Sequence, residues 1–275
     1  MSRVGCCIFA HMLRILLHPD YAKLFSAQVV ALIGTGLLTV ALGLLAYDLA
    51  GDRAGAVLGT AFAIKMVAYV GLAPIANAIA ERVPRKALLI GMDIVRAAVA
   101  LVLPFIDAAW QIYVLIFVLQ SASATFTPAF QATMPDILEE EADYTRALSL
   151  SRLAYDLENL ISPMLAGLLL LVMSYHGLFG GTVIGFAGSA ALVWSATIPQ
   201  RRRDTKARSF RDRLTRGIRI YLATPRLRGL LALNMSAAAA GAFVIVNTVV
   251  MVKAGYGGSE TGVATALAAF GAGSM

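Results

Sequence analysis

Residues Leu24–Tyr47 read LFSAQVVALIGTGLLTVALGLLAY, an apolar run of 24 residues without one charged side chain. As a helix it would rise about 36 Å, enough to cross the roughly 30 Å hydrocarbon core of a bilayer. The whole chain is similar: of its 275 residues, 59% are hydrophobic and 14% charged. Soluble proteins average roughly 45–50% and 25%. The composition therefore predicts an all-α membrane protein and excludes a water-soluble globule.

Further spans are expected wherever about 20 mostly apolar residues follow one another. The long uncharged stretch 159–200 is expected to break at Tyr175-His176-Gly177 and at the Gly180-Gly181 pair. The expected spans are Leu24–Tyr47, Ala54–Ala80, Ala87–Ile106, Ala108–Pro135, Ser149–Ser174, Leu178–Ile198, Gly229–Val252 and Thr261–Met275.

These spans divide the chain into four expected parts. Residues 1–20 form a cytoplasmic N-terminal segment, 21–200 a six-helix transmembrane bundle, 201–228 a basic cytoplasmic linker, and 229–275 the start of a second bundle with part of an eighth helix. Apolar residues recur in the linker at helical spacing, so we expect an amphipathic helix on the membrane surface. They are Phe210, Leu214, Ile218 and Tyr221.

Lysine and arginine are distributed unequally between the two sides of the membrane. With a cytoplasmic N-terminus, 19 basic residues lie on the cytoplasmic side, two on the outer side (Arg53 and Lys253), and two within the membrane. Eleven of the 19 lie between Arg201 and Arg228. Because positive charge stays inside, the bias predicts a cytoplasmic N-terminus. It also accounts for the net charge of +7 without a nucleic-acid partner.

The residues that enzymes and metal centres need are absent from the expected spans. The three histidines, His11, His18 and His176, fall in a tail or an outer loop. Cys6 and Cys7 are neighbours, which does not suit a disulfide framework, and two thiolates alone make no zinc site. The chain contains neither a phosphate loop nor a dinucleotide fingerprint. The sequence predicts no enzyme, no cofactor and no metal site.

Polar residues line one face of three expected spans. A polar stripe is disfavoured against lipid tails, so it faces a water-filled cavity or a neighbouring helix. We interpret the stripes, together with Lys65, as a substrate cavity, with polar helix packing as the alternative. The stripe residues are Gln28, Thr35, Thr39, Gln120, Ser123, Thr127, Gln131 and Asn234.

Charges inside the spans are costly. Lys65 lies 11 residues into its span, about 16 Å deep, where a lysine costs about 2.5–3.5 kcal/mol on insertion scales. It therefore needs a carboxylate, a cavity or an anionic ligand. Two further pairs stand one helical turn apart and are expected to neutralise each other. These intramembrane pairs are Asp93 with Arg96 and Arg152 with Asp156.

The turn after the second span reads NAIAERVPRK at residues 77–86. It resembles the turn between helices two and three of the major facilitator superfamily, Gly-x-x-x-Asp-Arg-x-Gly-Arg-Arg/Lys, with Asn77 and Pro84 in place of the two glycines. In that family the turn steadies the outward-facing state. The resemblance implies a conformational latch made of Glu81, Arg82, Arg85, Lys86 and, at the end of the fourth span, Asp136.

Two other segments resemble the bacterial drug- and siderophore-exporting branch of that superfamily. Residues 128–136, PAFQATMPD, resemble its Pro-Ala-x-x-Ala-x-x-Pro-Asp, and 162–167, SPMLAG, are similar to the antiporters' Gly-Pro-x-x-Gly-Gly. One departure is Thr35 after Gly34, where drug–proton antiporters often carry an aspartate. The resemblance runs from about Leu16 to the end. It implies a six-helix N-terminal bundle of the major facilitator fold and an incomplete second half, in the bacterial inner membrane.

The resemblance implies a secondary active transporter that exports small organic molecules by alternating access, coupled to protons. Metal-ion efflux and a truncated, non-transporting membrane scaffold are the alternatives. The expected partners are the lipid bilayer and a small-molecule substrate, without nucleic acid. The superfamily has twelve helices, so we expect this chain alone to be incomplete as a transporter, unless a second chain or copy completes the bundle.

Overall fold

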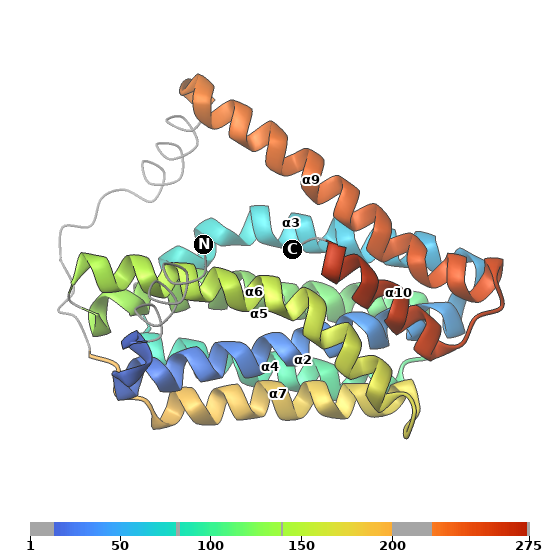
Figure 1. The fold of residues 1–275 in the computed structure, drawn as a ribbon, viewed down its shortest axis with the longest axis horizontal. Coiled ribbons are helices and arrows are strands. Elements are labelled where there is room, and N and C mark those ends of the chain that lie inside the picture. Colours follow the sequence, from blue (N-terminus) through green and yellow to red (C-terminus); the bar gives the residue numbers. More distant parts are fainter. Residues whose placement is uncertain (1–13, 81–82, 139, 200–221, 274–275) are drawn as a thin grey trace, which may run out of the picture.

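The computed structural model describes residues 14–80, 83–138, 140–199 and 222–273, and the regular secondary structure in these residues consists of helices (Figure 1). The elements are η1 Arg14–Leu17, α2 Pro19–Ala50, η2 Gly51–Arg53, α3 Ala54–Ala80, α4 Arg85–Val102, η3 Leu103–Phe105, α5 Ala109–Ile137, α6 Glu141–Leu169, α7 Tyr175–Ser195, α9 Pro225–Val250, η4 Met251–Gly255 and α10 Glu260–Gly273. The prediction of an all-α membrane protein is confirmed.

Five stretches of the described residues are long and apolar enough to cross a membrane. The first, Pro19–Tyr69, joins α2 to the first half of α3, and the others are Arg85–Phe105, Ala109–Ile137, Tyr175–Ser195 and Pro225–Gly255. The more charged α6 and the 14-residue α10 pack against each other within the same assembly. Each expected span overlaps one of the observed helices. The predicted linker comprises residues 201–228, and residues 200–221 lie outside the part of the chain that the structure describes.

Two helix boundaries differ from the prediction because a hydrophobic span is not the same as a helix. We expected a span from Ser149, whereas α6 begins at Glu141. Acidic residues in its first turn favour the positive end of the helix dipole, and an Arg146–Asp143 pair at 2.6 Å supports that turn. Likewise α2 begins five residues before Leu24, with Pro19 at its first position.

The predicted break between the fifth and sixth spans was wrong in detail. Helix α6 ends at Leu169, residues 170–174 form the connection, and α7 begins at Tyr175 and runs through Gly180 and Gly181. The reason lies in packing: a Cβ atom added to Gly181 would stand 2.9 Å from Cδ1 of Leu37 on α2. This glycine therefore permits close approach of two helices rather than ending one.

The bundle is built around α2, which contacts α3, α6 and α7. At the crossing of α2 and α7 the backbones touch, because a Cβ on Gly185 would lie 3.0 Å from the Cα of Gly34. There the hydroxyl of Thr182 also donates a hydrogen bond of 3.0 Å to the Gly34 carbonyl. Small residues thus replace side-chain interlocking at this crossing.

Helix α9 packs against the other helices at one end only. Its C-terminal end approaches α2, where Val249 is buried and meets Gly43, whereas residues 230–240 are exposed. Figure 1 shows α9 diverging from α3 towards its N-terminal end. Helix α10 then returns along α6.

Candidate functional site

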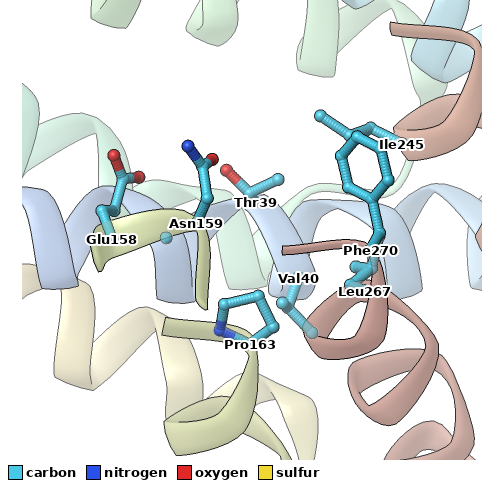
Figure 2. Close-up of a pocket in the computed structure, with 9 residues that line it drawn as sticks. Thr39, Val40, Glu158, Asn159, Pro163, Ile245, Leu267 and Phe270 are labelled. Atoms are coloured by element: carbon cyan, nitrogen blue, oxygen red, sulfur yellow. The ribbon is translucent and has the colours of Figure 1, made fainter. Parts of the chain in front are cut away.

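A pocket lies where α2 and α6 of the first bundle meet α9 and α10 (Figure 2). The space between its lining residues, counted together with open solvent at its mouth, is about 390 Å³. Polar side chains gather at one end and apolar ones at the other, as Figure 2 shows. Its lining residues are Gly36, Thr39, Val40, Glu158, Asn159, Pro163, Ile245, Leu267 and Phe270.

A proline in α6 shapes the wall of this pocket. Pro163 has no N–H, so the carbonyl of Asn159 one turn earlier lacks its helical donor. Helix α10 passes that carbonyl at Gly271, where an added Cβ would collide with it. A second close approach joins Gly167 to Ala264, whose Cβ lies 3.3 Å from a Cβ built on the glycine. Glycine thus lets α10 close the pocket against α6.

Another glycine brings α6 against α2. A Cβ on Gly36 would collide with the side chain of Ser162 and would lie 3.6 Å from Cγ of Glu158. The acid is therefore held beside α2 by helix packing. Across the pocket floor, the Thr39 hydroxyl donates a 3.0 Å hydrogen bond to the Thr35 carbonyl, which leaves its oxygen free to accept from a ligand.

Lys65 on α3 is half-buried, with its ammonium 5.7 Å from the ring centre of Phe62. It interacts electrostatically with Glu158 of α6. In the described part of the chain, neither group makes a direct ion pair. A carboxylate on another helix therefore acts on Lys65 through a longer-range electrostatic interaction and not through an ion pair.

Glu158 was not singled out by sequence reasoning. Asp156, the other acid nearby in the sequence, lies on a different face of the same helix. The sequence feature that could have identified Glu158 is its position: a carboxylate five residues before Pro163, inside a stretch otherwise long enough to span the membrane.

Of the predicted cavity residues, Thr39 lines the described pocket, whereas Lys65, Gln28 and Thr35 are not among its lining residues. Gln28 is buried and accepts a 2.9 Å hydrogen bond from the Ser151 hydroxyl, a polar contact between α2 and α6. The Thr35 hydroxyl donates to Ala31 of its own helix at 2.9 Å. The remaining five lie outside this pocket: Gln120, Ser123 and Thr127 are half-buried, and Gln131 and Asn234 are exposed.

The two intramembrane pairs occupy different environments. Asp93 and Arg96 form a buried ion pair on α4, and the Ser189 hydroxyl of α7 donates to Asp93 at 2.7 Å. The Arg96 guanidinium lies 4.2 and 4.6 Å from the ring centres of Phe126 and Phe186. This cluster ties α4 to α5 and α7.

The second pair is a surface contact. Arg152 and Asp156 approach to 3.5 Å, with side chains 79% and 44% exposed. Such a pair contributes little to stability, and it lies away from the pocket lining.

The predicted latch is described in part, since Glu81 and Arg82 lie outside the described residues. Arg85, at the start of α4, forms an ion pair with Asp136 and donates to the carbonyl of Ala132, both near the end of α5. A cation near the C-terminal carbonyls of a helix is favoured by the helix dipole. The structure therefore brings together two of the five predicted latch residues.

Lys86 points to a different helix end. Its ammonium donates to the carbonyl of Ala196 at 2.8 Å, just after α7. Lys23 of α2 donates to the neighbouring carbonyl of Ser195 at 3.0 Å. The ends of α5 and α7 thus each receive a basic residue from the start of α4.

At the opposite end of the bundle, Tyr175 of α7 donates a hydrogen bond to Asp48 of α2. Nearby, the ammonium of Lys253 lies 6.0 Å from the ring centre of Tyr47. This second contact joins the π-helical segment η4 to α2. The packed end of α9 is therefore also the end with polar contacts to the first bundle.

Comparison with known proteins agrees with this architecture. Residues 24–275 match the family described as Major Facilitator Superfamily. Macrolide efflux protein A of Streptococcus pyogenes is 25% identical over 185 residues, covering 66% of this chain and 45% of that protein. The uncharacterized MFS-type transporter YfiS of Bacillus subtilis is 28% identical over 123 residues, or 45% and 29% of the two chains. The chain spans less than half the length of these relatives.

Two solved structures share the fold. A mutant of the nucleoside transporter NupG superposes with a TM-score of 0.74 at 12% identity, covering 92% of this chain and 64% of that one. A bacterial homologue of the human lysosomal transporter Spinster, inward-facing and unoccupied, gives 0.70 at 14% identity, with coverages of 92% and 58%. Together with the family match over residues 24–275, the fold shows that this chain belongs to the Major Facilitator Superfamily, whose members are membrane transporters and not enzymes.

Proposed function

We propose that the protein is a secondary active exporter of small organic molecules that works by alternating access. The observation that carries the proposal is the position of the pocket, between the first bundle and α9–α10. Alternating access requires a ligand site at the contact between two bodies that rock against each other. Export, rather than uptake, is supported by the similarity to a macrolide efflux protein.

Helix α9 contacts the first bundle near its C-terminal end, where Val249 and Val250 approach Gly43 and Gly55. The charge bias of 19 to two supports a cytoplasmic position for the opposite end of the helix. The proposal is therefore of a bacterial inner-membrane protein with a cytoplasmic N-terminus.

The latch residues have a defined part in this proposal. Arg85, Asp136 and Lys86 join the cytoplasmic ends of α4, α5 and α7. A few charge contacts of this kind can bias a two-state equilibrium when one state makes them better. Glu81 and Arg82 complete the latch by resemblance.

Energy coupling is assigned to protons by the same resemblance, and the second wall of the cavity to the second bundle of the superfamily fold, to which α9 and α10 belong. We keep the four expected parts of the chain, with boundaries at residues 20, 200 and 228, as the proposed domain division.

The proposal is tested by drug accumulation in a pump-deficient bacterial host. Cells expressing the full-length protein should hold less of a fluorescent macrolide than cells with an empty vector, and a protonophore should abolish the difference. Equal accumulation across macrolides and a wider panel of organic compounds would refute export. Protection against metal salts alone would instead favour metal-ion efflux, and no phenotype with full membrane insertion would favour a scaffold.

A further inference from the structure

We infer that the pocket binds an apolar amine in its protonated form, and that the N–H groups of the ammonium donate hydrogen bonds to Glu158, Asn159 and Thr39. The inference names a substrate class for the site described above, so it rests on the proposed function. It concerns binding, however, and is tested without transport.

The charge of the pocket comes from one residue. Among the nine lining residues, Glu158 alone carries an ionisable side chain, and Figure 2 shows its carboxylate at the polar end. In the described part of the chain this carboxylate makes no direct ion pair. A carboxylate inside a membrane bundle is costly unless a cation meets it. The pocket therefore favours a ligand with a positive charge over a neutral or an anionic one.

The two neutral polar residues at this end present acceptors to a ligand. The Thr39 hydroxyl has a single hydrogen, which it donates to the Thr35 carbonyl at 3.0 Å. Asn159 donates an amide N–H to the Tyr155 carbonyl at 3.2 Å, and its side-chain oxygen can only accept. An ionised carboxylate is an acceptor too. The polar end thus combines three acceptor oxygens, those of Thr39, Asn159 and Glu158.

This arrangement discriminates between two kinds of organic cation. A primary ammonium carries three N–H donors, whereas a quaternary ammonium carries none. Charge-assisted N–H···O bonds are roughly twice as strong as neutral ones. A quaternary cation would gain the attraction of the carboxylate but would leave the acceptor oxygens without hydrogen bonds. The number of N–H groups, and not the charge alone, should therefore decide the affinity.

The nearby Lys65 does not fill this role. It is absent from the pocket lining, and its ammonium lies 5.7 Å from the ring centre of Phe62 on its own helix. It makes no ion pair with Glu158. A ligand ammonium in hydrogen-bond contact would stand closer to the carboxylate than Lys65 does, and Coulomb attraction grows as the distance falls. We therefore expect the ligand, and not Lys65, to pair with Glu158.

The remaining wall selects an apolar body. Ile245 of α9 and Leu267 and Phe270 of α10 lie opposite the polar end in Figure 2. The ring of Phe270 suits an aromatic ligand, because aromatic pairs prefer offset-stacked or edge-to-face contacts. Since the acceptors belong to α2 and α6, a ligand with an amine at one end and a ring at the other would contact all four helices.

Four probes with one ring system separate these requirements. They are 2-(2-naphthyl)ethylamine, its N,N,N-trimethyl quaternary derivative, 2-(2-naphthyl)ethanol and 3-(2-naphthyl)propanoic acid. Binding to the full-length protein in phosphatidylcholine nanodiscs is measured by equilibrium dialysis at about pH 8, where the amine stays protonated, and binding to empty nanodiscs is subtracted. The amine should bind at least about tenfold more tightly than each of the other three, which corresponds to about 1.4 kcal/mol.

Two variants should act on different probes. Glu158→Gln should weaken both cations at least about tenfold and leave the alcohol unchanged. Thr39→Val should weaken the amine at least about threefold, the size of a modest hydrogen bond, and leave the quaternary cation unchanged. The latter result separates lost N–H donation from the bulk of the methyl groups.

Matched controls accompany both variants. Thr39→Ser keeps the hydroxyl and should bind the amine as the wild type does. Asp156→Asn, a carboxylate-to-amide change two residues before Glu158, should preserve the wild-type order because Asp156 lies outside the pocket lining. Misfolding would weaken all four probes together, so selective losses identify the ligand contacts.

A wild-type protein that binds the amine no better than the alcohol, or no better than the quaternary cation, overturns the inference. So does an unchanged order in Glu158→Gln, or an equal loss of all four probes in both variants. Amine binding by a protein that exports nothing from cells would refute the proposed function while supporting this inference. Export of other compounds by a protein that binds the amine no better than the alcohol would do the reverse.

Discussion

Replacement of Gly36 by alanine should push α6 away from α2 and displace Glu158 from its place beside the pocket. The added Cβ would collide with both Cβ and Oγ of Ser162. Cβ is fixed to the backbone, so a rotamer change of Ser162 cannot relieve the contact, and the helices themselves must shift.

The magnitude follows from the cost of overpacking, typically about 1–3 kcal/mol for an extra methyl group in a well-packed core. Gly180→Ala on α7 is the control, because an added Cβ there meets nothing within 4 Å. Its helix propensity alone should stabilise the protein by up to about 1 kcal/mol. The two alanine variants should therefore differ in sign.

The assay is unfolding in mixed micelles by titration with a denaturing detergent, followed by tryptophan fluorescence. Ser162→Gly in the Gly36→Ala background should restore most of the lost stability, because it removes the atoms in collision. Equal stability of Gly36→Ala and Gly180→Ala would refute the packing that places Glu158. Failure of the second substitution to rescue would show that the collision lies elsewhere.

The remaining predictions concern four charged residues. Arg85→Ala should reduce export several-fold with unchanged membrane insertion, measured by accumulation assays and surface-normalised blots. Full export by this variant would contradict the role of Arg85 in the latch. Asp93→Asn should destabilise the protein by about 3–5 kcal/mol, because it leaves Arg96 buried without its carboxylate. Arg152→Gln, at an exposed pair, should cost less than about 1 kcal/mol; equal losses in thermal-shift measurements would contradict the difference in burial. Lys65→Ala should keep insertion intact and abolish or redirect export, and unchanged export of every compound would reduce Lys65 to a tolerated packing residue.

The helices could be predicted from the sequence because the membrane imposes a length and a polarity on each one. Leu24–Tyr47 and Ala54–Ala80 illustrate this, since both fall inside the observed α2 and α3 with little error. Boundaries outside the apolar core were less accessible. The first turns of α6 are polar and are set by helix-terminal charges rather than by hydropathy.

The candidate site was less predictable because it depends on which helices meet. The depth of Lys65 indicated that a carboxylate was needed, but its own helix offers none within one turn, and Glu158 of α6 follows 93 residues later in the chain. Polar stripes likewise do not reveal their partners. Gln28 proved to bond with Ser151 between two helices, whereas Thr39, on the same stripe, lines the pocket.

Distance measurements between pairs of spin labels at the two ends of α9 test alternating access most directly. The full-length protein would carry labels at Val67→Cys and Leu233→Cys, both exposed near the diverging part of α3 and α9, or at Ala56→Cys and Met251→Cys near the packed end. Pulsed electron paramagnetic resonance in nanodiscs is recorded over a range of pH, with and without the macrolide of the accumulation assay. We predict that conditions that shorten the first distance lengthen the second. Two distances that stay fixed, or that change in the same direction, under all conditions would contradict a transporter that opens alternately to either side.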